Sequence, residues 1–370
     1  MQIQPYSPAS DFLGVIRPSA GRHTLEHLLH WLEASREQLD TALTRHGALL
    51  FRGFDVPNAE SFERVALRIS PDLKRQYLGN SPRNARSTYT FTASELPAHY
   101  PIMQHCEMSF LPSAPARLFF CCTGAPGSPG GETPLADCRA VLEQLDPDVR
   151  ERFLSRQLRI VRNYAPPGKG TGLDPWQLKS WPEIFSTEDR QAVEALAAKE
   201  GTRCEWRADG GLRLIREQPF VQPHPVTGDQ IWFNHLQVFH SEAARFEYRQ
   251  ILARQPSLQA FGVWGLLEAL TAGKRWFKRP EDIATQCFYD DGTPIAIDDV
   301  KHVIEVFWQN MAFPRWQNGD FTVIDNFRTS HGRMPYRGPR EVLVAFTEGR
   351  PVTPPGTSRE NSQAALPLPA

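Results

Sequence analysis

Apolar segments with the composition of β-strands gather near the two ends of this chain of 370 residues, whereas its middle is different in character. These segments occur at 48–55, 88–95, 117–122, 302–309, 321–327 and 341–346. The middle contains helical patterns and loops, with shorter strand-like pieces, at 138–156, 187–200, 211–216, 229–234 and 240–253. Strands far apart in sequence must meet to bury their apolar side chains, so we expect one β core built from both ends of the chain.

The order of these segments also predicts how the chain is divided. Leucines recur at helical spacing over 24–46, which predicts a helix before the first strand. No repeat or linker splits the chain, so we expect a single domain over 1–350 that carries a large insertion at about 140–300. The segment 351–370 is rich in proline and polar residues and is expected to be a frayed tail.

Composition excludes several classes of protein. Lys and Arg total 41 and Asp and Glu total 42, a net charge of −1, so we expect no nucleic-acid partner and no binding to an anionic membrane. No run approaches 18 apolar residues, and no secretory leader pattern is present. Six cysteines without a C-x-x-C pair favour reduced thiols, and we therefore expect a cytoplasmic protein.

The segment MQHCEMSF (103–110) contains the candidate metal ligands. His105 and Glu107 are two residues apart, so on a strand both side chains would point to the same face. His331, in NFRTSHGRMP, is the candidate third ligand from the other end of the chain. Two histidines and one carboxylate with open positions are typical of non-heme Fe(II) oxygenases. Taken alone, the H-x-E tripeptide is also compatible with a strand whose polar face meets solvent.

Six blocks of the sequence together resemble the TauD/TfdA family of Fe(II)/2-oxoglutarate dioxygenases, especially members similar to the syringomycin-pathway aspartyl hydroxylase. The blocks are HGALLFRGF (46–54), TASELP (92–97), QHCEMSF (104–110), GGETPLAD (130–137), TGDQIWFN (227–234) and GDFTVIDNFRTSHGRMPYRGPREVLVAF (319–346). The resemblance implies a mainly β fold with flanking helices. Its core would be a double-stranded β-helix, or jelly roll, of the clavaminate synthase type, with a large helical and loop insertion.

The resemblance also implies the roles of the metal ligands. His105, Glu107 and His331 would bind Fe(II), which would take 2-oxoglutarate and O₂ as cosubstrates. Related halogenases have a small residue at the position of Glu107, so its retention favours oxygenation over halogenation. The family usually has H-N-E where this chain has Cys106, and we expect Cys106 to be a small, semi-buried thiol without a catalytic part.

By the same resemblance, Arg340 and Thr133 would bind the distal carboxylate of 2-oxoglutarate. A guanidinium suits this role because it can donate to both carboxylate oxygens. Arg333 and Arg337 lie near Arg340 and are alternatives, and Thr133 could instead bond its own loop backbone.

The substrate is less well defined by the sequence. In the taurine and aryloxyacetate enzymes of the family, a second arginine four residues further on binds the substrate's anion, and here that position is Val344. Asn234 and Asn326 match polar positions of the syringomycin-type branch, and each could line the substrate pocket or satisfy backbone groups at a strand end. Three further histidines, expected in packing or surface roles, are His224, His235 and His240.

We therefore expect an enzyme that hydroxylates an unactivated C–H bond of a small, amino-acid-like substrate and releases succinate and CO₂. The substrate would belong to natural-product biosynthesis, either free or tethered to a carrier protein. Desaturation or cyclisation at the same iron centre is an alternative. A zinc hydrolase and a non-catalytic jelly-roll binding protein are alternatives of other classes. The sequence is also compatible with a homo-oligomer.

Overall fold

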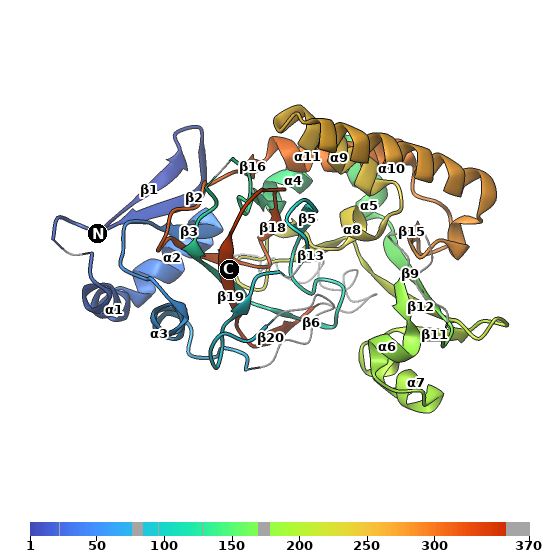
Figure 1. Ribbon diagram of the computed structural model, residues 1–370, viewed down its shortest axis with the longest axis horizontal. Coiled ribbons are helices and arrows are strands. Elements are labelled where there is room, and N and C mark those ends of the chain that lie inside the picture. Colours follow the sequence, from blue (N-terminus) through green and yellow to red (C-terminus); the bar gives the residue numbers. More distant parts are fainter. Residues whose placement is uncertain (22, 76–83, 95, 128, 169–177, 353–370) are drawn as a thin grey trace, which may run out of the picture.

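A seven-stranded sheet joins the two ends of the chain. The computed structural model describes residues 1–352 except 22, 76–83, 95, 128 and 169–177, so the expected tail, beyond Pro351 and Val352, lies outside the described residues. In spatial order the strands are β1 (Gln2–Ser7), β2 (Ser10–Arg17), β3 (Ala48–Phe51), β17 (Phe321–Asp325), β7 (Arg117–Gly124), β19 (Glu341–Phe346) and β4 (Phe91–Thr92). The expected convergence of distant strands is confirmed (Figure 1).

The pairing of β3 with β17 shows why distant segments meet. Both strands are almost entirely buried, so each needs partners on both faces. Phe51 pairs with Phe321 in the register, and their rings stack with centroids 4.2 Å apart. Such directly opposed aromatic side chains stabilise a sheet beyond the area that they bury.

A smaller sheet faces the large one and forms the other layer of a jelly roll. Its order is β16 (Met311–Ala312), β8 (Leu135–Asp137), β18 (Thr329–Arg333) and β5 (Ile102–His105). Alternate residues of β7 point to opposite sides, so that Phe120 lies in the core between the sheets and packs on His331 of β18. Two further strand pairs form separate two-stranded sheets, β6 (Ser113–Pro115) with β20 (Gly349–Pro351) and β13 (Val221–Pro223) with β14 (Gln230–Trp232).

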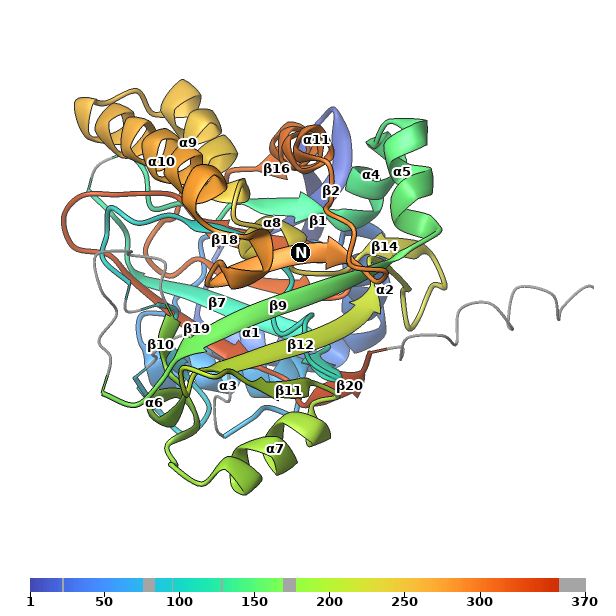
Figure 2. The same cartoon turned by 90° about the vertical axis from the view of Figure 1, so that its right-hand side faces the viewer.

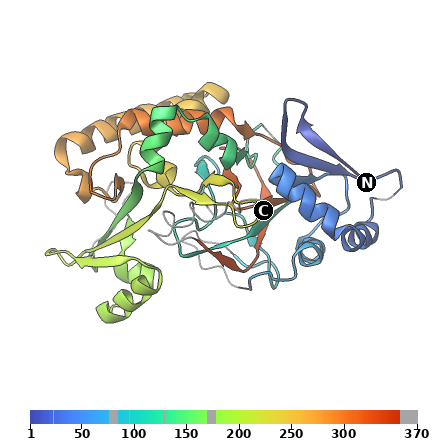
Figure 3. The same cartoon turned by 180° about the vertical axis from the view of Figure 1, so that it is seen from behind.

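Three helices pack against the outer face of the large sheet: α1 (Leu25–Ala34), α2 (Arg36–His46) and α3 (Ala59–Ile69). Figure 3 shows this end of the molecule from behind, beside the N-terminus. The single helix expected over 24–46 is interrupted, because Ser35 ends α1 and begins α2. Asn58 caps α3 by accepting a hydrogen bond from the Ser61 amide.

The insertion contains a five-stranded sheet of its own as well as the expected helices. Its strands are β9 (Gln157–Ala165), β10 (Leu178–Ser180), β11 (Arg203–Trp206), β12 (Leu212–Pro219) and β15 (Thr285–Tyr289). Figure 2 shows β9, β12 and β11 side by side at one end of the molecule. The helices are α4 (Cys138–Gln144), α5 (Pro147–Leu154), α6 (Trp181–Phe185), α7 (Arg190–Lys199), α8 (Leu236–Phe239), α9 (Ala243–Arg254), α10 (Leu258–Phe277) and the short 3₁₀ helix η1 (Pro280–Asp282).

One predicted strand is wrong. The segment 302–309 belongs to the helix α11 (Ile297–Gln309). Its buried side chains include Val300, Val303, Ile304 and Phe307, whose spacing of three and four residues is helical. The β-branched residues suggested a strand, but burial along one helical stripe outweighs their modest preference. Within the described residues, no helix is both long and apolar enough to cross a membrane.

Candidate metal centre

The two histidines lie side by side because their strands are paired. His105 is the last residue of β5 and His331 is in the middle of β18, and the antiparallel register places them directly opposite each other. Their ring centroids are 4.3 Å apart. The jelly roll thus joins positions 226 residues apart, as the sequence predicted.

Glu107 reaches the histidines by a different route from the one expected. It is not on a strand, because β5 ends at His105 and the chain turns there. Met108 follows with φ of 56°, a left-handed conformation that such a side chain rarely adopts. The turn brings Glu107 Oε2 to 3.9 Å from His105 Nε2 and 3.7 Å from His331 Nε2.

The side chain of Asn326 holds this turn in place. Its Oδ1 accepts a hydrogen bond from the Glu107 amide at 2.7 Å, and its Nδ2 donates to the carbonyls of Glu107 and Pro115 at 3.0 and 2.9 Å. Asn326 is fully buried. Asn234 is similar, since it donates to the Phe220 carbonyl and accepts from the Leu236 amide. Both side-chain amides therefore satisfy backbone groups, which is one of the two roles expected for them from the sequence.

The donor set fits a divalent metal ion. His105 Nδ1–H donates to the Met103 carbonyl at 2.9 Å, which leaves the lone pair of Nε2 directed at Glu107. Donor atoms of His105, Glu107 and His331 all lie within 4.8 Å of one another. Two atoms that each lie about 2.1 Å from one ion are at most about 4.2 Å apart, so the measured carboxylate–imidazole distances are compatible with shared coordination. In the described part of the chain, this is the one such group of three ligands.

Arg340 and Thr133, which the resemblance paired, do meet. Arg340 immediately precedes β19, and it donates from Nε to the Gly131 carbonyl at 2.7 Å and from Nη2 to Thr133 Oγ1 at 3.3 Å. Trp316 Nε1 donates to the same hydroxyl at 3.2 Å. Burial, and then the charge of Arg333, lower the pKa of Arg340 to about 10. Its guanidinium remains a cation at neutral pH.

The loop beside Arg340 requires glycine. Gly131 has a φ of 72°, and a Cβ at this position would lie 3.1 Å from Arg340 Cδ. A larger residue would therefore strain the backbone and press on the arginine stem.

The neighbouring arginines are placed differently. Arg333 is buried and donates to the carbonyls of Leu96, Pro97 and Tyr100, so it secures the chain that leads into β5. Arg337 is exposed. Val344 is completely buried in the core between the sheets, which agrees with the absence of an anion clamp at that position.

Cys106 points into a hydrophobic core. Its Sγ lies 3.7 Å from the Sγ of Cys138, and burial raises its pKa well above the usual value of a thiol. All six cysteines are free, as the sequence predicted.

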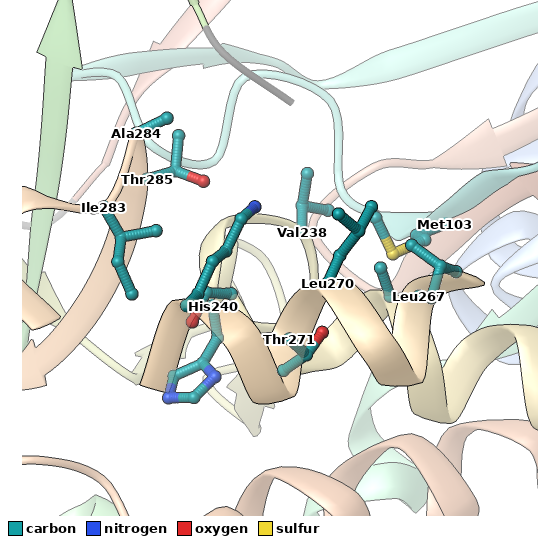
Figure 4. A pocket seen from close by; sticks show the side chains of 12 residues that line it. Met103, Val238, His240, Leu267, Leu270, Thr271, Ile283, Ala284 and Thr285 are labelled. Atoms are coloured by element: carbon teal, nitrogen blue, oxygen red, sulfur yellow. The ribbon is translucent and has the colours of Figure 1, made fainter. Parts of the chain in front are cut away.

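The three further histidines are buried and have local partners. His224 Nε2 lies 2.9 Å from Asp325 Oδ2. His240 lies beside a cavity of about 40 Å³ between α10 and β15, and burial lowers its pKa to about 4 (Figure 4). His235 lies nearer the centre, where its Nδ1 is 2.6 Å from Ser109 Oγ and its ring centroid is 5.8 Å from that of His105. No sequence pattern predicts that His235 adjoins the candidate metal ligands.

Comparisons with known proteins agree with this geometry. The family model of the taurine catabolism dioxygenase TauD, TfdA family, matches residues 3–346. The dapdiamide synthesis protein DdaC of Enterobacter agglomerans is 29% identical over 331 residues, which are 89% of each chain. A clavaminate synthase-like protein of Arabidopsis thaliana is 26% identical, with 85% of this chain and 86% of that protein covered.

Solved structures match the fold. PvcB, described as an Fe, α-ketoglutarate-dependent oxygenase from an isonitrile synthetic pathway, superimposes with a TM-score of 0.51 at 17% identity over 94% of this chain and 95% of that one. AAD-2, solved with Mn(II) and N-oxalylglycine, gives a TM-score of 0.51 at 14% identity over 96% of this chain and all of that one. The jelly roll is confirmed. Since the family model matches nearly the whole sequence, the chain belongs to the TauD/TfdA family of Fe(II)- and 2-oxoglutarate-dependent dioxygenases.

Proposed function

We propose that His105, Glu107 and His331 hold Fe(II), and that Arg340 and Thr133 bind the distal carboxylate of 2-oxoglutarate. The observation that carries this proposal is the convergence of three candidate ligand side chains on one point, with the half-buried guanidinium of Arg340 next to a neighbouring strand. Three protein ligands leave positions for a chelating cosubstrate and for O₂. Bound iron then supplies the oxidising chemistry.

The protein's part in the reaction is positioning and charge. The hydrogen bond from His105 to the Met103 carbonyl keeps Nε2 available as a ligand, and Asn326 fixes the turn that presents Glu107. Arg340 compensates the charge of a carboxylate that must lose water on entering the pocket. Thr133 adds a hydroxyl whose orientation is set by Trp316.

We propose hydroxylation of an unactivated C–H bond in a small, amino-acid-like substrate of natural-product biosynthesis, with release of succinate and CO₂. Retention of Glu107 supports oxygenation over halogenation, and the similarity to a dapdiamide synthesis protein supports a biosynthetic setting. Desaturation and cyclisation would use the same centre. Family membership decides against the zinc hydrolase and the non-catalytic binding protein.

Anaerobic spectroscopy tests the proposal. Wild-type protein supplied with Fe(II) and 2-oxoglutarate should develop a weak visible charge-transfer band, and His331→Ala should not. His30→Ala is the control, because His30 is an exposed residue of α1. A wild-type protein that binds Fe(II) but gives no band with 2-oxoglutarate would overturn the proposal.

A further inference from the structure

Arg162 is a buried cation in the middle of the insertion sheet. It lies on β9, opposite Leu214 of β12 on one side and Thr285 of β15 on the other. On the same face of β9, Leu158 and Ile160 enter the hydrophobic core that also contains Phe110. Arg162 therefore points from the insertion toward the jelly roll, and only 7% of its surface is exposed.

The guanidinium of Arg162 has no hydrogen-bond acceptor and no ion-pair partner among the described residues. It lies over the ring of Phe110, whose centroid is 5.5 Å from Cζ. Other buried arginines differ: Arg328 is paired with Asp137 at 2.7 Å, and Arg333 donates to three carbonyls. A buried charge without a partner is costly, so an unpaired arginine in this position calls for an explanation.

A second buried arginine, on the neighbouring strand, does have hydrogen-bond partners. Arg216 of β12 donates to Gln218 Oε1 at 3.3 Å and to the Glu200 carbonyl. The register pairs Leu214 with Arg162 and Arg216 with Ile160, so the two arginine side chains lie on the same face of neighbouring strands. Burial, and then the charge of Arg162, lower the pKa of Arg216 to about 10. Among the described residues, no carboxylate forms an ion pair with either of these two arginines, so this face of the insertion sheet is positively charged.

Short contacts connect Arg162 to the metal centre. Phe110, under the guanidinium, lies 4.7 Å from the ring of His235, which in turn lies 5.8 Å from the ring of His105. The insertion is tied to the same loop, because Gln218 Nε2 donates to the Ser109 carbonyl at 3.1 Å. The arginine is thus placed on the side of the centre that the insertion covers.

We propose that Arg162 binds a carboxylate of the substrate and so places the substrate between the insertion sheet and the metal. This inference rests on the proposed function. Val344 cannot hold an anion, so the chain needs another cation if its substrate is an acid, and Arg162 can donate to both oxygens of one carboxylate. An amino acid tethered to a carrier as a thioester has lost its α-carboxylate, so Arg162 would bind either the α-carboxylate of a free acid or a carboxylate in the substrate's side chain.

Thermal stability of the ligand-free protein gives the first test. Arg162→Met removes an unpaired buried charge and should raise the melting temperature by about 2–4 °C. Arg328→Met is the contrast, because it leaves Asp137 buried without its partner and should lower the melting temperature. A fall for Arg162→Met comparable to that of Arg328→Met would show a structural role and overturn the inference.

Binding gives the second test. The anaerobic protein with Fe(II) and 2-oxoglutarate would be titrated with L-amino acids and with aliphatic mono- and dicarboxylic acids, each beside its amide. At least one acid should perturb the charge-transfer band and raise the melting temperature, while its amide should not. Arg162→Met should weaken this acid on the order of tenfold or more, and Arg162→Lys should weaken it less.

Arg159→Gln is the matched control, because Arg159 lies on the opposite face of the same strand and is paired with Glu217. It should bind the acid as the wild type does. Equal binding of acid and amide, unchanged binding in Arg162→Met, or no response to any acid would overturn the inference. Absence of the band in the wild type without any acid would instead count against the proposed function.

Discussion

The jelly roll and the insertion satisfy their buried polar groups in different ways. On the jelly-roll side, two polar side chains of the centre have partners from the same sequence blocks, since Asn326 holds the turn at Glu107 and Thr133 accepts a hydrogen bond from Arg340. On the insertion side, Arg162 is buried against an aromatic ring with no acceptor among the described residues. This difference is consistent with the two proposals, in which the jelly roll binds iron and the cosubstrate and the insertion binds the substrate.

The largest effect is expected from removing a metal ligand. His105→Ala, Glu107→Ala and His331→Ala should each reduce succinate formation to background, because the remaining two ligands hold iron poorly. Iron content after desalting and the melting curve are the measurements, and the fold should stay largely intact. Normal turnover in a protein lacking both His105 and Glu107 would show that the metal lies elsewhere.

Arg340 should have the next largest effect. Arg340→Ala should raise the KM for 2-oxoglutarate about 10²-fold, or about 3 kcal/mol, because a buried carboxylate would lose its cation. Arg340→Lys should be intermediate, since an ammonium group supplies charge without a bidentate geometry. Succinate formation over a range of 2-oxoglutarate concentrations measures this.

The neighbouring arginines serve as controls for Arg340. Arg337→Ala should leave the KM nearly unchanged, and Arg333→Ala should mainly lower stability, because three backbone carbonyls lose their donor. If cosubstrate binding is lost in either of these variants and unchanged in Arg340→Ala, the altered arginine, and not Arg340, binds the distal carboxylate of 2-oxoglutarate.

A smaller effect on iron affinity is expected in the jelly roll from changing the turn that positions Glu107. Asn326→Ala removes three hydrogen bonds and should weaken both folding and iron affinity, with about 1–3 kcal/mol lost from stability. Asn234→Ala should lower stability without lowering iron affinity, because its partners are Phe220 and Leu236. Equal iron affinity in both variants, measured by equilibrium dialysis, would contradict a positioning role for Asn326.

The folding stability should depend on pH through one buried carboxyl group of the insertion. Burial raises the pKa of Glu247, on α9, to about 7, although Trp308 Nε1 donates to it at 2.9 Å. The folded state therefore holds a proton that the unfolded state releases near pH 4.5, and stability should fall as the pH rises from about 4.5 to 7. The loss is at most about 3 kcal/mol. Glu247→Gln should flatten this part of the curve in denaturant titrations, and an unchanged slope would count against the assignment.

Much of the jelly roll and its centre could be predicted because the signals are local. Apolar runs such as 321–327 and 341–346 mark strands, and motifs around His105 and His331 mark the ligands. The prediction that Glu107 lies on the same strand as His105 is wrong, however. Its position depends on a turn at Met108 and on Asn326, a contact across 219 residues that no local pattern reveals.

The insertion was harder to predict. The sequence pattern does not predict the helix α10. This helix is apolar on nearly every side and contains three glycines, so no polar stripe reveals its helical period. Arg162 did leave a signal, since it is a charge on the face of β9 that otherwise carries Leu158, Ile160 and Tyr164. Only the fold shows that this face turns toward the metal centre.

Anomalous diffraction at the iron edge tests the central claim most directly. In crystals grown without oxygen with Fe(II) and 2-oxoglutarate, a single strong peak should lie about 2.0–2.2 Å from His105 Nε2, His331 Nε2 and a Glu107 oxygen. The distal carboxylate of 2-oxoglutarate should contact Arg340. A peak that shares fewer than all three of these ligands, or a cosubstrate whose distal carboxylate contacts a different arginine, would contradict the account.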